Sequence, residues 1–342
     1  MHRSGAADAG AASEVQALAM SEFLPRRSDG LLLSRDSDAF GLHESFRTAR
    51  QAQRIVPLRR GVYAPSEVAA EMSAVARYRA TVLAVGHQRR QPVFAGFSAA
   101  VLWGLPVVQP IISDVYLIAT GTSGRRRNGV VEFARREGVL QDEHNGLVLT
   151  ALPDTLIDVA RTMPLITALV MVDAALHEPR FSGVAPLCTR EELFSAYSRR
   201  LPFPGSARVL AVLERGTTLA DSVLETVSRV HVEQLGFPEP VLQYPVRLPR
   251  SGRTVFLDTA WPEHGVWGEA DGDGKYLGNA LSNGDTRTVA EIVLAEKRRE
   301  NDVRAATRWN CGRWDWGEGW HRERLRAILL EAGLPITRRP WR

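Results

Sequence analysis

The alternation of apolar and polar residues predicts two short helices and a basic hairpin near the amino terminus. Ser34 can cap a helix that carries Asp36 and Asp38 in its first turn, where acidic side chains favour the helix dipole. A second helix is expected over residues 43–53, and residues 55–63 have the pattern of two strands joined by a basic turn. Helix, tight turn, helix and hairpin is the order of elements in a winged helix-turn-helix.

The middle of the chain mixes helical and strand periodicities. Helices are expected over 67–86 and 152–176, and strands over 115–119 and 130–134. The pair Asn128-Gly129 between the two strands is a hairpin signal. Residues 179–204 are rich in turn-forming residues, so we expect a connection there.

A separate α/β unit is expected from about residue 217 onward. The expected elements are a helix over 220–235, strands over 241–248, 254–261 and 266–271, a charged helix over 289–306, a strand over 309–316 and a helix over 321–332. Asp221 or Ser222 can cap the first of these helices. Helices and strands in this order can build one small α/β core.

The composition is that of a globular protein with a mild preference for polyanions. Of the 342 residues, 44% are hydrophobic and 24% are charged. The net charge of +4 comes almost entirely from arginine, whose planar fork suits phosphate. The two cysteines, Cys188 and Cys311, are too few and too far apart for a disulfide framework or a zinc cluster. Charges interrupt the most hydrophobic stretch, and the amino-terminal residues lack an apolar segment. We therefore expect a cytoplasmic protein without a membrane span.

Five arginines on the second helix and the hairpin are candidates for contacts with DNA phosphates. They are Arg47, Arg50, Arg54, Arg59 and Arg60. Only Glu44 opposes them in the same segment, and contacts of this kind would make DNA binding depend strongly on salt. The alternative is that these side chains form an ordinary solvated face. The surrounding winged pattern favours DNA contact.

Acidic side chains gather on one hairpin of the last unit. If its turn centres between Glu263 and His264, Asp258 and Glu269 are directly opposite each other, and such pairs lie about 4.5–5.5 Å apart. Asp271 projects from the same face as Glu269. Facing carboxylates destabilise a sheet unless a cation lies between them, and Mg²⁺ (or Mn²⁺) held by oxygen ligands would remove the conflict.

Two further residues can complete a site for phosphodiester hydrolysis. Lys275 can bring an ammonium group to the same place, and Glu225 on the preceding helix is another candidate. A metal there would activate water and offset charge in the transition state. Spacing alone favours a simpler alternative, in which these acids line a solvated strand edge and Lys275 pairs with one of them.

Several segments of the last third of the chain occur in a specific order. They are residues 222–225, 256–263, 268–272, 275–276, 296–304 and 313–316. Together they resemble the very-short-patch-repair-like branch of the PD-(D/E)xK nuclease superfamily. The resemblance implies metal ligands at Asp258 and Glu269, with Glu225, Asp271 and Lys275 completing the site. The superfamily's lysine usually lies two residues after the glutamate, where this chain has Asp271, so the resemblance also allows an inactive site.

Three segments of the front half, residues 58–64, 97–106 and 155–161, form a second pattern. They resemble the AbiEi-family antitoxin-like proteins of type IV toxin–antitoxin systems. In that family the winged domain binds promoter DNA and represses its operon. The resemblance implies DNA as a partner and suggests a cognate toxin encoded nearby.

These observations predict an α/β (α+β) chain with a winged helix-turn-helix, a mixed α/β region and a restriction-endonuclease-like core. The expected parts are a disordered tail (1–25), the winged region (26–66), the mixed region (67–178), a linker (179–216) and the nuclease-like domain (217–342). One hypothesis is a magnesium-dependent DNA endonuclease joined to a DNA-reading domain. The other is a transcriptional repressor or antitoxin whose nuclease-like fold is inactive.

Overall fold

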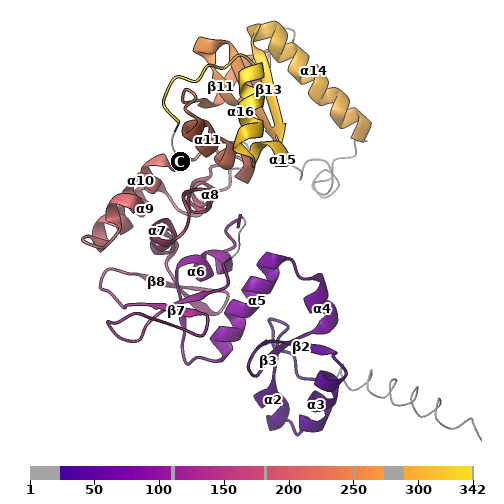
Figure 1. Cartoon of the computed structure of the whole chain (residues 1–342), viewed down its shortest axis with the longest axis vertical. Coiled ribbons are helices and arrows are strands. Elements are labelled where there is room, and N and C mark those ends of the chain that lie inside the picture. The colour runs from indigo at the N-terminus through magenta and orange to yellow at the C-terminus, as the bar shows by residue number, and fades with distance from the viewer. Residues whose placement is uncertain (1–23, 109–111, 181–182, 250, 273–288, 341–342) are drawn as a thin grey trace, which may run out of the picture. The chain divides into compact units, whose positions relative to one another are not determined.

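A computed structural model describes residues 24–108, 112–180, 183–249, 251–272 and 289–340, and shows a mixed α/β protein (Figure 1). The chain forms two compact units, Met1–Val159 and Ala160–Arg342. Within the described ranges, every helix is too short or too polar to cross a bilayer. The mixed α/β class predicted from the sequence is thus confirmed.

The first unit begins with short helices around a small sheet. Its first elements are β1 (Leu32–Leu33), α2 (Ser34–Ala39), α3 (His43–Gln51), β2 (Ile55–Arg59), β3 (Val62–Pro65), α4 (Ser66–Glu71) and α5 (Ala74–His87). The sheet has the order β1-β3-β2, with antiparallel pairing throughout. Phe46 and Ala49 of α3 are buried against this sheet, so α3 turns its other side to solvent.

One helix was expected over residues 67–86, and the structure has two. The break falls at Ser73, whose hydroxyl accepts a hydrogen bond from the Ala76 N–H at 3.2 Å and caps α5. Serine competes well for backbone donors at a helix start, because its oxygen satisfies an N–H that has no partner inside the helix. A local cap therefore overrides the continuous apolar pattern.

The rest of the first unit is built on a mixed sheet. Its elements are β4 (Val93–Phe94), α6 (Gly96–Leu102), β5 (Val115–Ile118), β6 (Arg125–Arg127), β7 (Val130–Phe133), β8 (Gln141–His144), β9 (Leu147–Thr150) and α7 (Leu152–Thr162), which ends in the second unit. The sheet order is β6-β7-β5-β4-β9-β8. Asn128 and Gly129 both have positive φ, at 50° and 69°, and form a tight turn. The turn joins β6 to β7, whereas the strands expected to form this hairpin, β5 and β7, pair in parallel, so the expected pairing is wrong.

The second unit places four helices before its sheet. Its elements are α8 (Leu165–Leu176), α9 (Arg190–Arg200), α10 (Ser206–Arg215), α11 (Val223–Leu235), β10 (Val241–Arg247), β11 (Thr254–Trp261), the 3₁₀ turn η1 (Pro262–His264), β12 (Val266–Asp271), α14 (Val289–Thr307), β13 (Asn310–Asp315), α15 (Trp316–Gly319) and α16 (Arg322–Glu331). The interval 179–216, expected to be a connection, contains α9 and α10. A capping box at Thr189 and Glu192 starts α9.

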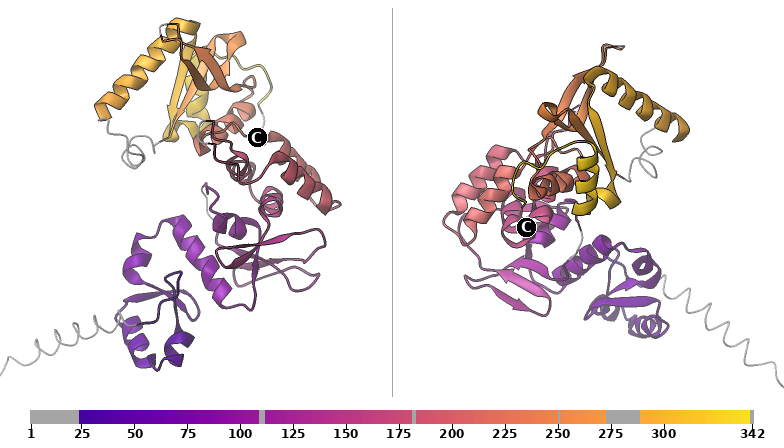
Figure 2. Two further views of the ribbon diagram at one scale, coloured as in Figure 1. Left: turned by 180° about the vertical axis from the view of Figure 1, so that it is seen from behind. Right: turned by 45° about the horizontal axis from the view of Figure 1, so that its top comes forward.

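The sheet of the second unit has the order β10-β11-β12-β13, antiparallel except for the parallel pair β12–β13. Leu224, Trp261, Trp314 and Leu329 belong to an apolar core that α11 and α16 form with one face of the sheet. On the other face, Val303 of α14 packs with residues that include Trp267. Figure 2 shows α14 as one long helix beside the sheet. Burial of both faces fixes the strand positions and hence the side chains described next.

Candidate functional site

The hairpin of β11 and β12 has the register that the sequence predicted. Thr259 pairs with Gly268 and Trp261 pairs with Val266, which is the register of a turn centred between Glu263 and His264. One step further along, Asp258 of β11 reaches across to β12, where its Oδ2 accepts a hydrogen bond from the Ala270 N–H at 3.0 Å. The turn chemistry of residues 262–265 therefore positions an acid of β11 against the acidic end of β12.

Glu269 of β12 is a buried carboxylate held by arginines. Its residue is only 4% exposed. Nη1 of Arg299, on α14, lies 2.7 Å from one carboxylate oxygen and 2.8 Å from the other, while Nη2 of Arg299 donates to the Phe256 carbonyl at 2.7 Å. Arg313 of β13 approaches Glu269 to 3.5 Å. Two cationic side chains from flanking elements thus compensate this acid.

Asp271 lies two residues beyond Glu269 and shares one of its arginines. Nε of Arg313 is 3.2 Å from Oδ2 of Asp271, whose side chain is 15% exposed. The parallel register of β12 and β13 brings these groups together, because it places Arg313 directly beside Glu269. Asp271 thus adds negative charge to the site beside Arg313.

Glu225 approaches from the first turn of α11. Ser222 caps this helix by accepting from the Glu225 N–H at 3.2 Å, and the Glu225 carboxylate accepts from the Ser222 hydroxyl at 2.9 Å and from the Asp221 N–H at 3.0 Å. The cap thus fixes the side chain as well as the helix start. Of the two caps that the sequence allowed, the structure uses Ser222.

Asp258 connects the acids electrostatically. Burial and, after it, the nearby charge of Asp258 together raise the pKa of Glu225 to about 8. Burial and the Asp258 charge also raise the pKa of Glu269 to about 7, although Arg299 and Arg313 oppose the shift. Like charges disfavour joint ionisation. Asp258, Glu225 and Glu269, which we call the acid cluster, therefore need added positive charge to be fully ionised at neutral pH.

The acid cluster suits a divalent cation in its charge and its oxygen ligands. Mg²⁺ prefers one or two carboxylates, which Asp258 and Glu269 can supply. Among the residues that the structure describes, no group of three acidic, histidine or cysteine side chains is arranged to hold a metal. A cation would therefore have to displace Arg299 from the Glu269 carboxylate. The donor set fits such a cation only after that exchange.

Sequence reasoning named five catalytic candidates and missed two arginines. Glu225, Asp258, Glu269 and Asp271 lie around one end of the β11–β12 hairpin, while Lys275 lies outside the described residues. Arg299 and Arg313 were missed as site residues. Both lie within segments on which the family resemblance rests. This was the one signal in the sequence that could have marked them as site residues.

The five arginines of the front unit have different environments. Arg47 pairs with Glu44 at 2.6 Å, and Arg59 donates to Gln88 at 3.3 Å and to the Asn128 carbonyl at 3.0 Å. Arg54 is half-buried. Arg50 on α3 and Arg60 in the hairpin turn are exposed, and neither has a side-chain partner among the described residues. These two side chains are the most accessible to a phosphate backbone.

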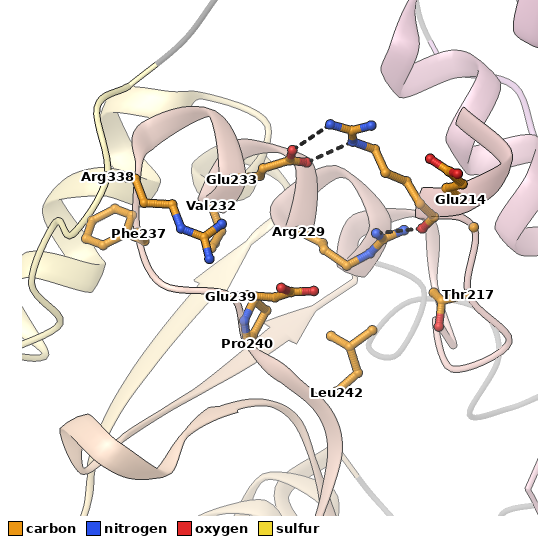
Figure 3. A pocket seen from close by; sticks show the side chains of 12 residues that line it. Glu214, Thr217, Arg229, Val232, Glu233, Phe237, Glu239, Pro240, Leu242 and Arg338 are labelled. Atoms are coloured by element: carbon orange, nitrogen blue, oxygen red, sulfur yellow. Dashed lines mark hydrogen bonds and ion pairs between the residues drawn. The ribbon is translucent and has the colours of Figure 1, made fainter. Parts of the chain in front are cut away.

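A cavity of about 360 Å³ lies beside the ends of α10 and α11 (Figure 3). Two of its arginines are paired. Arg215 donates to Glu233 at 2.9 and 3.2 Å, and Arg229 donates to the Arg215 carbonyl at 2.9 Å and to the buried Asp173 at 2.7 Å. Glu214, Glu239 and Arg338 also line the cavity, and acids and arginines therefore alternate on its wall without a surplus of positive charge.

Two proteins of Mycobacterium tuberculosis are similar to this chain. They are the uncharacterized protein MT2308 of strain CDC 1551 / Oshkosh and the uncharacterized protein Rv2248 of strain ATCC 25618 / H37Rv. Each is 26% identical over 213 residues, which cover 59% of this chain and 74% of the relative. No family model matches the chain. We therefore infer the function from the residues themselves.

Proposed function

We propose that this protein is a cytoplasmic DNA-binding protein whose second unit is a divalent-metal-dependent endonuclease of the restriction-endonuclease-like fold. One observation carries the proposal: Asp258 of β11 accepts from the Ala270 N–H beside buried Glu269 of β12, and its charge helps to raise the pKa of both Glu269 and Glu225 of α11. Buried like charges are costly, and such arrangements occur mainly where function needs them. The helix–three-strand–helix–strand order from α11 to β13 supports the same fold.

The front unit supports the DNA-binding half of the proposal. The order α2, α3, β2, β3 and the small antiparallel sheet are those of a winged helix-turn-helix, with α3 as the recognition helix and the β2–β3 turn as the wing. Arg50 and Arg60 are exposed on these two elements. Arg47, Arg54 and Arg59 would contribute less, since each is held by neighbours or partly covered.

Each residue of the acid cluster has a role that follows from its contacts. Asp258 and Glu269 would hold a Mg²⁺ or Mn²⁺ ion, which supplies a polarised water and offsets charge on the phosphorus. Arg299 favours the ionised form of Glu269 until then. Glu225, fixed by Ser222 and the Asp221 N–H, is mostly protonated near neutral pH because burial and Asp258 raise its pKa to about 8, so it is placed to donate a proton. Asp271 orients Arg313 beside the site.

The decisive assay is nicking of supercoiled plasmid DNA by the full chain with Mg²⁺ or Mn²⁺. Asp258→Asn keeps the size of the side chain and removes its charge, and we expect a loss of about 100-fold or more, the scale for a lost electrostatic group. Glu263→Gln is the matched control, because this exposed glutamate lies on the same hairpin outside the cluster. Equal nicking by the wild type and Asp258→Asn would reject the proposal.

A second candidate is a transcriptional repressor or antitoxin with an inactive nuclease fold. Two observations favour it: Arg299 occupies both oxygens of Glu269, and Asp271 stands where the superfamily has its lysine. Tight binding to the protein's own promoter without any nicking by the wild type would select this candidate. A gene for a toxin next to this one would then identify its partner.

A further inference from the structure

A second, open cavity runs along the outer edge of the sheet in the second unit. Its volume is about 530 Å³, and it lies where the end of α14 and the end of α16 meet β13. The lining residues are Arg304, Arg308, Trp309, Asn310, Cys311, Arg313, Ile328, Glu331 and Ala332. Since β13 is the last strand of its sheet, this wall is not covered by another described strand. We call this cavity the edge groove.

The edge groove carries a surplus of positive charge. Three arginines line it against one acid, Glu331. Arg308 is exposed and has no ion-pair partner in the described ranges. Arg304 is half-exposed and pairs only at the surface, with Glu300 at 2.9 Å. Because the Arg304 side chain is 52% exposed, solvent screens this pair and a competing anion can reach the guanidinium.

The arrangement of the arginines is built into the backbone. Arg304 lies in the last turn of α14, which ends at Thr307, and Arg308 follows the helix directly; both line the groove. Arg308 itself has a φ of 60°, a left-handed conformation that costs energy for a residue with a side chain. This turn ends α14 and directs the chain into Trp309 and β13. The groove's cationic wall is therefore a fixed feature of the junction.

The edge groove adjoins the acid cluster through Arg313. This side chain lines the groove and also lies 3.2 Å from Asp271 and 3.5 Å from Glu269. A strand held by Arg304 and Arg308 would therefore pass one side chain away from Glu269. The cavity of Figure 3 is less suited to a strand, since Arg215 and Arg229 are paired and three glutamates share its wall with the arginines.

The remaining lining suits a nucleotide strand better than a small reactive molecule. Trp309 offers an aromatic ring beside the arginines, and Asn310 is fixed by its donation to the Ala332 carbonyl at 3.1 Å. Arginine with tryptophan is a typical lining for strands, because phosphates and base faces can both be bound. Cys311 brings no thiolate chemistry, since burial raises the pKa of its thiol to about 12.

We propose that the edge groove binds the sugar–phosphate backbone of a nucleic-acid strand next to the acid cluster. This inference rests on the proposed function for its substrate class, but binding in the groove requires no metal and no cleavage. Arg304 and Arg308 contact phosphates, and Arg313 links the bound strand to Glu269 and Asp271. The groove thus adds a strand-binding subsite in the second unit that is separate from the winged region.

The test uses a fluorescein-labelled single-stranded hexanucleotide and the full chain in EDTA. A single strand of this length is a poor ligand for a winged helix-turn-helix, which reads duplex grooves. The double variant Arg304→Ala/Arg308→Ala should weaken binding about tenfold, and the slope of log K against log salt should fall by about 1.4, since each phosphate contact contributes about 0.7 for single strands. Fluorescence anisotropy measures both quantities.

Arg298→Ala is the matched control. This arginine is exposed on the same helix but does not line the groove, so its loss should change affinity less than about twofold, as expected for a charge without a direct phosphate contact. Equal losses in Arg298→Ala and the double variant would show diffuse attraction and overturn the proposal, as would no loss in either. Displacement of the hexanucleotide by inorganic phosphate at equal concentration would also overturn it, because the site would then bind isolated phosphate. Because binding is measured in EDTA, it does not depend on cleavage. An absence of plasmid nicking in the separate assay with Mg²⁺ or Mn²⁺ would therefore reject the endonuclease and leave the binding of the hexanucleotide in the groove standing.

Discussion

Asp173 and the acid cluster are both buried in the second unit, and they differ in how their negative charge is balanced. Asp173 of α8 is 1% exposed and accepts from the Thr217 N–H at 2.9 Å, the Thr226 hydroxyl at 2.8 Å and Arg229 at 2.7 Å. Burial raises its pKa, and every partner lowers it. One acid is matched by one arginine and two neutral donors, which is the pattern of a structural ion pair.

In the acid cluster, by contrast, a neighbouring carboxylate works in the same direction as burial. Asp258 raises the pKa of Glu225 and of Glu269, and the two arginines reach Glu269 but do not hold Glu225. Buried charge alone therefore does not indicate function. Buried negative charge that has too few counterions does indicate function, because replacing such a carboxylate with a neutral residue would make the fold more stable.

The largest difference between the two groups should appear when a cation is removed. Arg229→Ala leaves Asp173 buried without its counterion, and we expect the free energy of unfolding to fall by about 3–5 kcal/mol. Urea denaturation of the full chain measures it. Arg215→Ala is the control, because its pair with Glu233 is about one-third exposed on both sides and should contribute about 1 kcal/mol or less. A loss below 1 kcal/mol for Arg229→Ala would contradict the structural assignment.

Removing an acid from the cluster should have a smaller effect of opposite sign. Since the pKa values of Glu225 and Glu269 rise from 4.5 to about 8 and about 7, the folded protein binds more protons than the unfolded chain between these values. The stability gained from this excess is complete below pH 4.5 and is lost as pH rises towards 8. Asp258→Asn lowers both pKa values and should raise Tm at pH 8 by a few °C, since about 1 kcal/mol shifts Tm by about 2–4 °C at this size.

Calorimetric scans between pH 5 and 8 check this second prediction. The wild type should lose thermal stability across the range, and Asp258→Asn should show a flatter profile. Millimolar Mn²⁺ should reverse the loss in the wild type only. Identical profiles for the two proteins would mean that Asp258 does not act on the glutamates.

The smallest effect concerns the arginine that reaches Glu269. At pH 8, Arg299→Ala should tighten Mn²⁺ binding about threefold, or about 0.7 kcal/mol, because the cation no longer has to displace a guanidinium. Titration calorimetry provides the measurement, and Arg298→Ala on the same helix is the matched control. Weaker Mn²⁺ binding by Arg299→Ala would show that this arginine supports the cation site instead of competing with it.

Much of the local structure could be predicted because it depends on near neighbours in the sequence. Pro262 and Gly265 set the hairpin register, Asn128-Gly129 set a tight turn, and Ser222 caps α11. These signals act over a few residues and have few competing solutions. The position of Asp258 near the end of β12 followed from them directly.

The two arginines of the site could not be found in the same way. Lys297, Arg298 and Arg299 are consecutive, and periodicity in a charged helix does not show which of them meets the sheet. Arg313 reaches Glu269 only because β13 pairs in parallel with β12, 44 positions along the chain. Parallel pairing needs a long crossover, so no local signal fixes its register.

The crossover that lays β13 beside β12 is also the source of the cluster's counterion. In the described chain, α14 is the helix of this connection, and it carries Arg299 to Glu269 while Val303 packs on the sheet. Mutation can exchange individual side chains along the helix and so adjust how firmly the acids are restrained. Deleting the helix would also remove the connection that lets β13 pair in parallel with β12. The sheet and the counterion of Glu269 therefore depend on the same segment.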